Sequence, residues 1–156
     1  DFQPHNFLPQ DPDYADRVRS SFTRQRFMAY IGAELTALEP GYCEIRVPYR
    51  DELSQQHAFF HGGVMGTVAD NAGGYASYSL MVPADSILTV EYKLNIVAPG
   101  DGEALIARGR VLKPGRTLTV ARSDVFVLTG AGEKLCATAQ LTFICLPGQS
   151  DAPVGV

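Results

Sequence analysis

A single charged side chain interrupts a long apolar and glycine-rich stretch of the sequence. Asp70 is the only charged residue between Gly62 and Met81. A carboxylate in such surroundings is costly unless it is paired or used in chemistry, so Asp70 is a candidate general base or nucleophile. The alternative is a structural role, in which Asp70 caps a neighbouring loop or forms a hydrogen bond across a dimer interface.

The motif His61-Gly62-Gly63 stands at the start of the same stretch. Two glycines that open a helix expose amide N–H groups at the positive end of the helix dipole, where they can hold an oxyanion. Glycine also lets a carbonyl group approach the backbone without a Cβ in the way. The alternative is a tight turn with no chemical role.

These two candidate groups are far apart along a helix. With a rise of about 1.5 Å per residue, Asp70 lies roughly 12 Å from Gly62 along the helix axis. One chain therefore struggles to bring Asp70 to the start of its own helix, whereas an antiparallel helix from a second chain could bring it there. The spacing predicts active sites that are shared between subunits.

The element that carries both groups is predicted to be a central helix over about 62–80, a segment without proline. Its glycines lower intrinsic helix stability by about 1 kcal/mol each relative to alanine. Packing around the helix must therefore hold it, with glycines that admit the backbone of neighbouring elements.

The rest of the chain is predicted to supply a sheet and one further helix. Helical spacing covers residues 13–31, with Asp13 as a possible cap and Gly32 at the end. Alternating apolar residues and turn signals delimit strands at 33–38, 42–49, 88–96, 104–112, 118–128 and 134–146. In the segment 88–96, Val90 and Tyr92 belong to the apolar set that alternates with Thr89 and its polar neighbours. The pattern predicts an α+β fold in which an antiparallel sheet covers the central helix.

Length and composition indicate one domain and exclude several classes of protein. The chain has 156 residues, which suits a single domain over 13–146, preceded by an extended lead-in at 1–12 and followed by a loose tail at 147–156. A net charge of -4 argues against nucleic-acid binding. No apolar run approaches the ~20 residues that cross a membrane, and the three cysteines have no paired spacing, so a cytoplasmic protein with buried thiols is expected.

The run HGGVMGTVADNAGGYA at 61–76 resembles the signature of hotdog-fold acyl-CoA thioesterases, in the phenylacetyl-CoA thioesterase-like branch of the 4-hydroxybenzoyl-CoA thioesterase superfamily. The resemblance extends over roughly residues 31–146. It implies a hotdog fold, which is a strongly curved antiparallel sheet wrapped around a central helix. It also implies homodimers with a continuous sheet or homotetramers built from them, and the hydrolysis of acyl-CoA to a free acid and CoA.

Carried over residue by residue, the resemblance assigns the catalytic positions. Asp70 matches the catalytic carboxylate, which acts as general base on water or as nucleophile. The Gly62 amide matches the oxyanion donor, and His61 matches the motif histidine that fixes the loop. Gln55, six residues before His61, stands where family members often have an asparagine that holds water or substrate. Thr89 matches a Ser/Thr position that orients the attacking water in related enzymes.

Substrate-binding positions are less specific. The Gly63 amide accompanies that of Gly62, and Phe60 is a candidate for the acyl pocket, as are Phe59, Tyr75 and Tyr78. Lys113 and Arg116 flank a Pro-Gly turn and could meet the phosphates of CoA, or they are simply solvated turn charges.

Neither a cofactor nor a metal is expected, because CoA is part of the substrate and the histidines lack a ligand pattern. The sequence has no Gly-x-Ser-x-Gly elbow of a serine hydrolase. Two alternatives remain open. One is a hotdog hydratase or dehydratase, a lineage that usually carries a histidine with the aspartate on the helix. The other is a non-catalytic acyl-CoA-binding domain.

Overall fold

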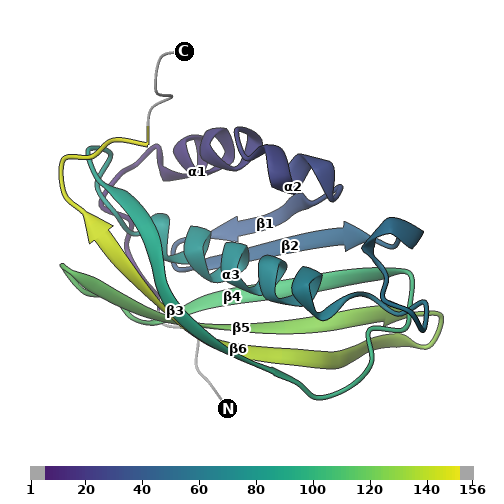
Figure 1. Ribbon diagram of the computed structural model, residues 1–156. Helices are drawn as coiled ribbons and strands as arrows, with labels where there is room; N and C mark the ends of the chain where they lie inside the picture. Colours follow the sequence, from purple (N-terminus) through teal and green to yellow (C-terminus); the bar gives the residue numbers. More distant parts are fainter. Residues whose placement is uncertain (1–5, 152–156) are drawn as a thin grey trace.

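In the computed structural model, which describes residues 6–151, a six-stranded sheet curves around one central helix (Figure 1). The elements in chain order are α1 (Tyr14–Thr23), α2 (Arg26–Tyr30), β1 (Glu34–Glu39), β2 (Tyr42–Pro48), the short 3-10 helix η1 (Asp51–Leu53), α3 (Gly62–Tyr78), β3 (Ser86–Ile96), β4 (Ala104–Lys113), β5 (Leu118–Thr129) and β6 (Gly132–Leu146). The predicted α+β architecture, with a central helix that begins at Gly62 and an N-terminal helix, is confirmed.

The strands lie in the order β1-β2-β4-β5-β6-β3, and every neighbouring pair is antiparallel. The edges are therefore β1 and β3. Figure 1 shows α3 lying inside the curve of the sheet, with β3 crossing in front and α1 and α2 above. The helix α3 packs against five of the six strands, with β4, β2 and β5 as its main neighbours.

Small residues on the sheet allow α3 to lie very close to it. A Cβ at Gly109 of β4 would be 2.2 Å from the carbonyl carbon of Ala72 and 2.4 Å from the amide nitrogen of Gly73. On β5, the hydroxyl of Ser123 donates a hydrogen bond of 2.7 Å to the carbonyl oxygen of Ala69. Packing against the sheet therefore holds a helix whose glycine content alone would not favour it.

The N-terminal helix is divided in two, so the continuous helix expected over 13–31 is wrong. Gln25 separates α1 from α2 with an extended backbone at φ -77° and ψ 101°. Its side chain donates a hydrogen bond of 2.7 Å to the hydroxyl of Tyr75 on α3, a tertiary contact that the local pattern does not contain. Asp13 occupies the N-cap of α1 without a capping hydrogen bond from its side chain, while Gly32, at φ +74°, follows α2 as expected.

A β-bulge changes which side chains of β3 face the helix. The pairing of β3 with β6 shifts between Thr89 and Glu91, so Val90 is the extra residue. Before the bulge Thr89 pairs with Phe143, and after it Tyr92 pairs with Leu141, both of which are buried. The alternation expected along 88–96 is therefore wrong at this point, because the bulge puts Thr89 on the same face as Tyr92.

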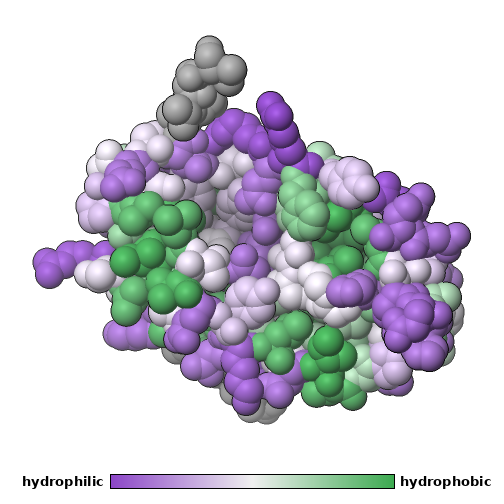
Figure 2. Space-filling view, viewed as in Figure 1, coloured by the Kyte–Doolittle hydropathy of each residue, from purple (hydrophilic) through white to green (hydrophobic). Residues whose placement is uncertain are grey.

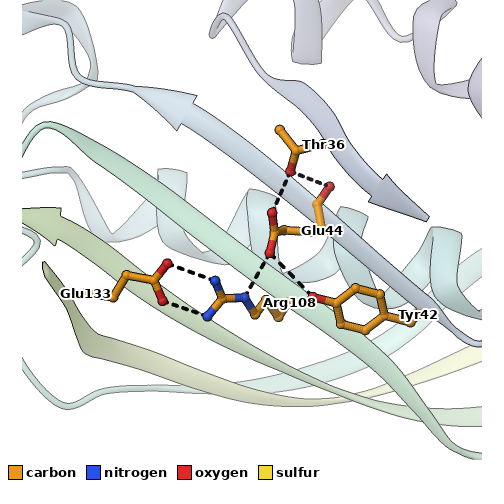
Figure 3. Close-up of polar contacts among 5 residues, drawn as sticks. All are labelled: Thr36, Tyr42, Glu44, Arg108 and Glu133. Atoms are coloured by element: carbon orange, nitrogen blue, oxygen red, sulfur yellow. Dashed lines mark hydrogen bonds and ion pairs between the residues drawn. The ribbon is translucent and has the colours of Figure 1, made fainter. Parts of the chain in front are cut away.

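The outer face of the sheet carries a polar network across several strands (Figure 3). The guanidinium of Arg108 on β4 donates to Glu44 on β2 at 2.9 Å and to both carboxylate oxygens of Glu133 at 2.7 and 2.8 Å. Thr36 and Tyr42 donate to the same Glu44 carboxylate at 2.8 and 3.4 Å. Burial alone would raise the pKa of Glu44, but the hydrogen bonds from Arg108 and Thr36 hold it below its usual value.

Part of the C-terminal segment is attached to the domain. The amide of Gly148 donates to Asp85 at 3.0 Å, and Arg24 forms an ion pair of 2.9 Å with Asp151. The other residues of the expected tail, 152–156, lie outside the described residues, as do residues 1–5 of the expected lead-in. Within the described part of the chain, no helix is long and apolar enough to cross a membrane.

Candidate functional site

Asp70 lies in the middle of α3 and faces β3. The hydroxyl of Thr89 donates a hydrogen bond of 2.8 Å to Asp70 Oδ1, so the bulge in β3 brings together two residues that the sequence had singled out separately. Burial raises the pKa of Asp70 above its usual value, and the hydrogen bond from Thr89 lowers it in part. A carboxylate with a raised pKa is a stronger base toward a water molecule.

Asp70 and Thr89 border a cavity of about 160 Å³ between α1, α3 and β3. Its walls combine aromatic and aliphatic side chains with a few polar groups: Ser21, Gln25, Asn71, Gly74, Tyr75, Tyr78, Ile87, Leu88, Phe143 and Asp151. Small-molecule sites in proteins usually have this mixture of apolar walls and a few polar groups. The half-buried carboxylate thus opens onto a space that can receive an apolar group.

His61 caps the start of α3 with its side chain. The Nδ1 atom of His61 accepts a hydrogen bond of 2.8 Å from the amide of Gly63. Because Nδ1 accepts this bond, Nε2 is the ring nitrogen that can donate to another group. The Gly63 amide, which the sequence suggested as a second oxyanion donor, is therefore engaged by the cap.

The Gly62 amide remains available at the same helix end. Among residues 6–151, no acceptor is bonded to this N–H group. Gly62 borders a second cavity of about 480 Å³, together with Gln55, Phe60, Met65 and residues 96–100. The structure therefore places four sequence-predicted residues around one space: Gln55, Phe59, Phe60 and Gly62.

The orientation of the Gln55 side chain follows from its contacts. Its Oε1 accepts a hydrogen bond from the amide of His57, in a turn where Ala58 has a φ of 62°. Because Oε1 is used in this way, the Nε2 group is left as the donor of the side chain. Gln55 can then offer an N–H to a carbonyl oxygen in the cavity beside Gly62.

The two cavities have no lining residue in common within one chain. Asp70 and Thr89 belong to the first, and Gln55, Phe60 and Gly62 belong to the second. The candidate base and the candidate oxyanion donor are therefore not assembled into one site by a single subunit, as the helix spacing had suggested.

The basic residues of the β4–β5 turn border neither of these two cavities. Lys113 and Arg116 are exposed, and Arg116 borders a cavity of about 430 Å³ with Ser77 and Leu80, at the C-terminal end of α3. The structure does not bring them near Asp70 or Gly62 of the same chain.

The described residues show no arrangement typical of a metal site, and their cysteine thiols are buried. No group of three or more His, Cys, Asp or Glu side chains between residues 6 and 151 is arranged to hold a metal ion. Cys43, Cys136 and Cys145 are buried free thiols, and burial raises the pKa of each.

Four polar residues around the Asp70 cavity were not predicted from the sequence: Ser21, Gln25, Asn71 and Asp151. Ser21 on α1 and Gln25, which lies between α1 and α2, are four residues apart, so both fall on one face of the helix that the sequence predicts over 13–31. Their polar character beside buried Phe22 was a usable signal. Asn71 directly follows Asp70, and its Oδ1 is buried without a partner among the described residues. Such an acceptor is suited to a donor from a bound molecule or from water.

The chain matches known proteins in sequence and in structure. A family model described as the thioesterase superfamily matches residues 57–134. A Saccharolobus solfataricus protein that is provisionally named an esterase is 29% identical over 127 residues, which cover 81% of this chain and 82% of that protein.

Solved structures extend the match to the whole fold. A thioesterase family protein from Silicibacter pomeroyi is 45% identical, with a TM-score of 0.85 and coverage of 86% of this chain and 99% of that chain. The PaaI protein from the phenylacetic acid degradation operon of E. coli is 16% identical, with a TM-score of 0.77 and coverage of 87% and 95%, which concerns the fold alone. The predicted hotdog fold is confirmed.

Proposed function

The chain belongs to the thioesterase superfamily, and we propose that it hydrolyses acyl-CoA thioesters to a free acid and CoA. The observation that carries this proposal is the half-buried Asp70 carboxylate, which is bonded to Thr89 and borders a largely apolar cavity. A thioester carbonyl has little resonance stabilisation, so a carboxylate, a positioned water and one or two N–H donors suffice without a cofactor.

In the proposed reaction the acyl group enters the Asp70 cavity with its carbonyl near the carboxylate. Asp70 takes a proton from water as the water oxygen attacks the carbonyl carbon, or it attacks the carbon itself and water cleaves the resulting anhydride. In the first route the C–S bond breaks as the tetrahedral intermediate collapses, and in the second it breaks as the anhydride forms, before water cleaves that anhydride. In both routes the sulfur of CoA leaves as a thiolate that is then protonated. Thr89 keeps the carboxylate oriented through its hydrogen bond of 2.8 Å.

The negative charge on the carbonyl oxygen requires donors, which we assign to the second cavity. The Gly62 amide lies at the N-terminus of the seventeen-residue helix α3, where the helix dipole favours an anion. The Nε2 group of Gln55 is the second donor beside it. His61 fixes the geometry of this helix start by its bond to the Gly63 amide.

We further propose that each active site combines Asp70 of one subunit with Gly62 of another. The support is the separation of the two cavities and the roughly 12 Å along α3 between these residues. Antiparallel packing of two α3 helices would bring the two groups together at each of two equivalent sites.

The edge strand β3 is the surface that we assign to this pairing. Its apolar side chains Leu88, Val90, Tyr92 and Ile96 are between 45% and 57% exposed. Figure 2 shows exposed hydrophobic groups near both ends of this strand. A long apolar edge strand is prone to pair with another strand, so a second copy of the chain can continue the sheet there.

The activity is tested by detecting the thiol released from acetyl-, hexanoyl-, decanoyl- and phenylacetyl-CoA. We expect thiol release from at least one of these esters, at a rate that increases in proportion to enzyme concentration. Binding of these esters without thiol release would instead support the acyl-CoA-binding alternative.

The shared site is tested by mixing two inactive variants, Asp70→Asn and Gly62→Val. If each site uses one residue from each subunit, a mixed dimer has one intact site, and random exchange restores about a quarter of the wild-type activity. If both residues serve the same chain, every site in the mixture is defective and no activity returns.

A further inference from the structure

One wall of the Asp70 cavity, on the side of α1, is formed by a hydrogen-bonded cluster. The hydroxyl of Tyr75 on α3 is 3.1 Å from the hydroxyl of Ser21 on α1, and the Nε2 group of Gln25 donates to it at 2.7 Å. Tyr75 is 5% exposed and Ser21 is 9% exposed. The ring of Phe22 packs edge-on against the Tyr75 ring at 5.9 Å, so the tyrosine is held in place from two directions.

The positions along α3 set the direction of the cavity. Asp70, Gly74 and Tyr78 follow at intervals of four residues, which places them on one face of the helix, about 6 Å apart along its axis. An acyl group attached to a carbonyl at Asp70 therefore extends along Gly74 toward the tyrosines. Gly74 keeps this passage open, because a Cβ there would lie 3.4 Å from the Phe143 ring on the opposite wall.

The size of the cavity limits what can enter. Its volume is about 160 Å³. A cavity of about 150 Å³ in another protein binds a benzene molecule, so this one has room for about six carbon atoms or a single ring. A longer chain that continues along α3 meets the side chains of Tyr75 and Tyr78.

We propose that Gln25 and Ser21 are specificity-determining residues that hold Tyr75 in the wall of the acyl pocket and restrict the substrate to short or single-ring acyl groups. This inference rests on the proposed function. Both residues precede residue 57, where the match to the thioesterase family model begins. In this proposal the limit on acyl length depends on two residues that lie outside the region matched by the family model.

Two variants change the pocket in opposite directions. Gln25→Ala removes the donor that fixes Tyr75 and empties space in that wall. Gly74→Ala narrows the passage beside Phe143, where the added methyl group meets the ring at ordinary contact distance. Alanine also favours a helix over glycine by about 1 kcal/mol, which keeps this variant folded. Arg26→Ala is the control, since Arg26 is exposed on α2 next to Gln25.

The measurement is kcat/KM for butanoyl-, hexanoyl-, octanoyl- and decanoyl-CoA with each protein. We expect the wild type and Arg26→Ala to favour hexanoyl-CoA or a shorter ester over decanoyl-CoA by at least about tenfold, a difference that a few methylene groups readily produce. The ratio of decanoyl to butanoyl should rise in Gln25→Ala and fall in Gly74→Ala. Equal profiles for Gln25→Ala and the wild type would overturn the proposal.

Calorimetric titration of the Asp70→Asn protein with hexanoyl-CoA and decanoyl-CoA reads the same preference without turnover. The Asp70→Asn protein should bind hexanoyl-CoA more tightly than decanoyl-CoA, and the Asp70→Asn/Gln25→Ala double variant should lose this preference. That result supports the proposed role of Gln25 and Ser21 even if the wild type releases no thiol. That combination would reject the hydrolase function alone. Thiol release by the wild type, with no preference for acyl length in either kcat/KM or calorimetric binding, would reject the proposed role of Gln25 and Ser21 but not the hydrolase function.

Discussion

Replacing Gly109 by alanine tests whether α3 lies as close to the sheet as the fold requires. The new Cβ would meet backbone atoms of α3 at 2.2 to 2.4 Å, whereas ordinary contacts begin at 3.4 Å. The helix must therefore move away by about 1 Å, because backbone atoms cannot rotate aside as a side chain does. Overpacking of this kind costs about 1–3 kcal/mol, and the upper end applies here.

Part of that cost is recovered, since alanine is favoured over glycine in a strand by about 0.5–1 kcal/mol. We therefore expect a net loss of about 2 kcal/mol, which lowers Tm by about 4–8 °C in a protein of this size. Thermal unfolding followed by circular dichroism measures it, with Gly130→Ala as control because no atom lies within 4 Å of a Cβ there. Equal Tm values for the two variants would refute the close packing of α3 on β4.

Three further variants test the site and the sheet. Thr89→Val removes a hydrogen bond that lowers the pKa of Asp70, so the acidic limb of the kcat/KM profile should move to higher pH; an unmoved limb would mean that Asp70 is not the titrating base. Gly62→Ala should reduce turnover by up to about 100-fold, because its Cβ crowds the oxyanion position, with little change in Tm because that Cβ meets only the end of a flexible side chain. Arg108→Gln should lower the free energy of unfolding by about 1–3 kcal/mol at neutral pH, as followed in urea. The contact between Arg108 and Glu44 stops contributing to stability as the pH falls through the lowered pKa of Glu44. The difference in the free energy of unfolding between Arg108→Gln and the wild type should therefore shrink in acid.

The architecture could be predicted from the sequence because its signals are local. The alternation of apolar residues in β2 places Cys43, Ile45 and Val47 in the core, and all three are 0% exposed. The glycine-rich stretch that begins at Gly62 forms the central helix, as its lack of proline and its apolar face indicated.

The parts that could not be predicted depend on contacts between distant residues. The break at Gln25 follows from its bond to Tyr75, fifty residues away, which no helical pattern contains. The bulge at Val90 is visible only in the register between β3 and β6. The resemblance singled out Asp70 and Thr89 separately, but only this bulge explains why the two side chains meet.

The role of Asp70 is the central claim, and the Asp70→Asn protein tests it most directly. Asparagine keeps the size of the side chain and an oxygen that can accept the hydrogen bond from Thr89, but it cannot take a proton from water. Burial raises the pKa of Asp70 in the folded protein, so the ionised carboxylate costs stability above its unfolded pKa, and asparagine removes that cost.

Turnover of the best acyl-CoA substrate and Tm at neutral pH should be measured on the same preparation of this variant. We predict that turnover falls by at least about 100-fold, as for the loss of a general base, while Tm stays level or rises. Turnover close to that of the wild type, or a large fall in Tm with turnover retained in the folded fraction, would contradict a catalytic role for Asp70.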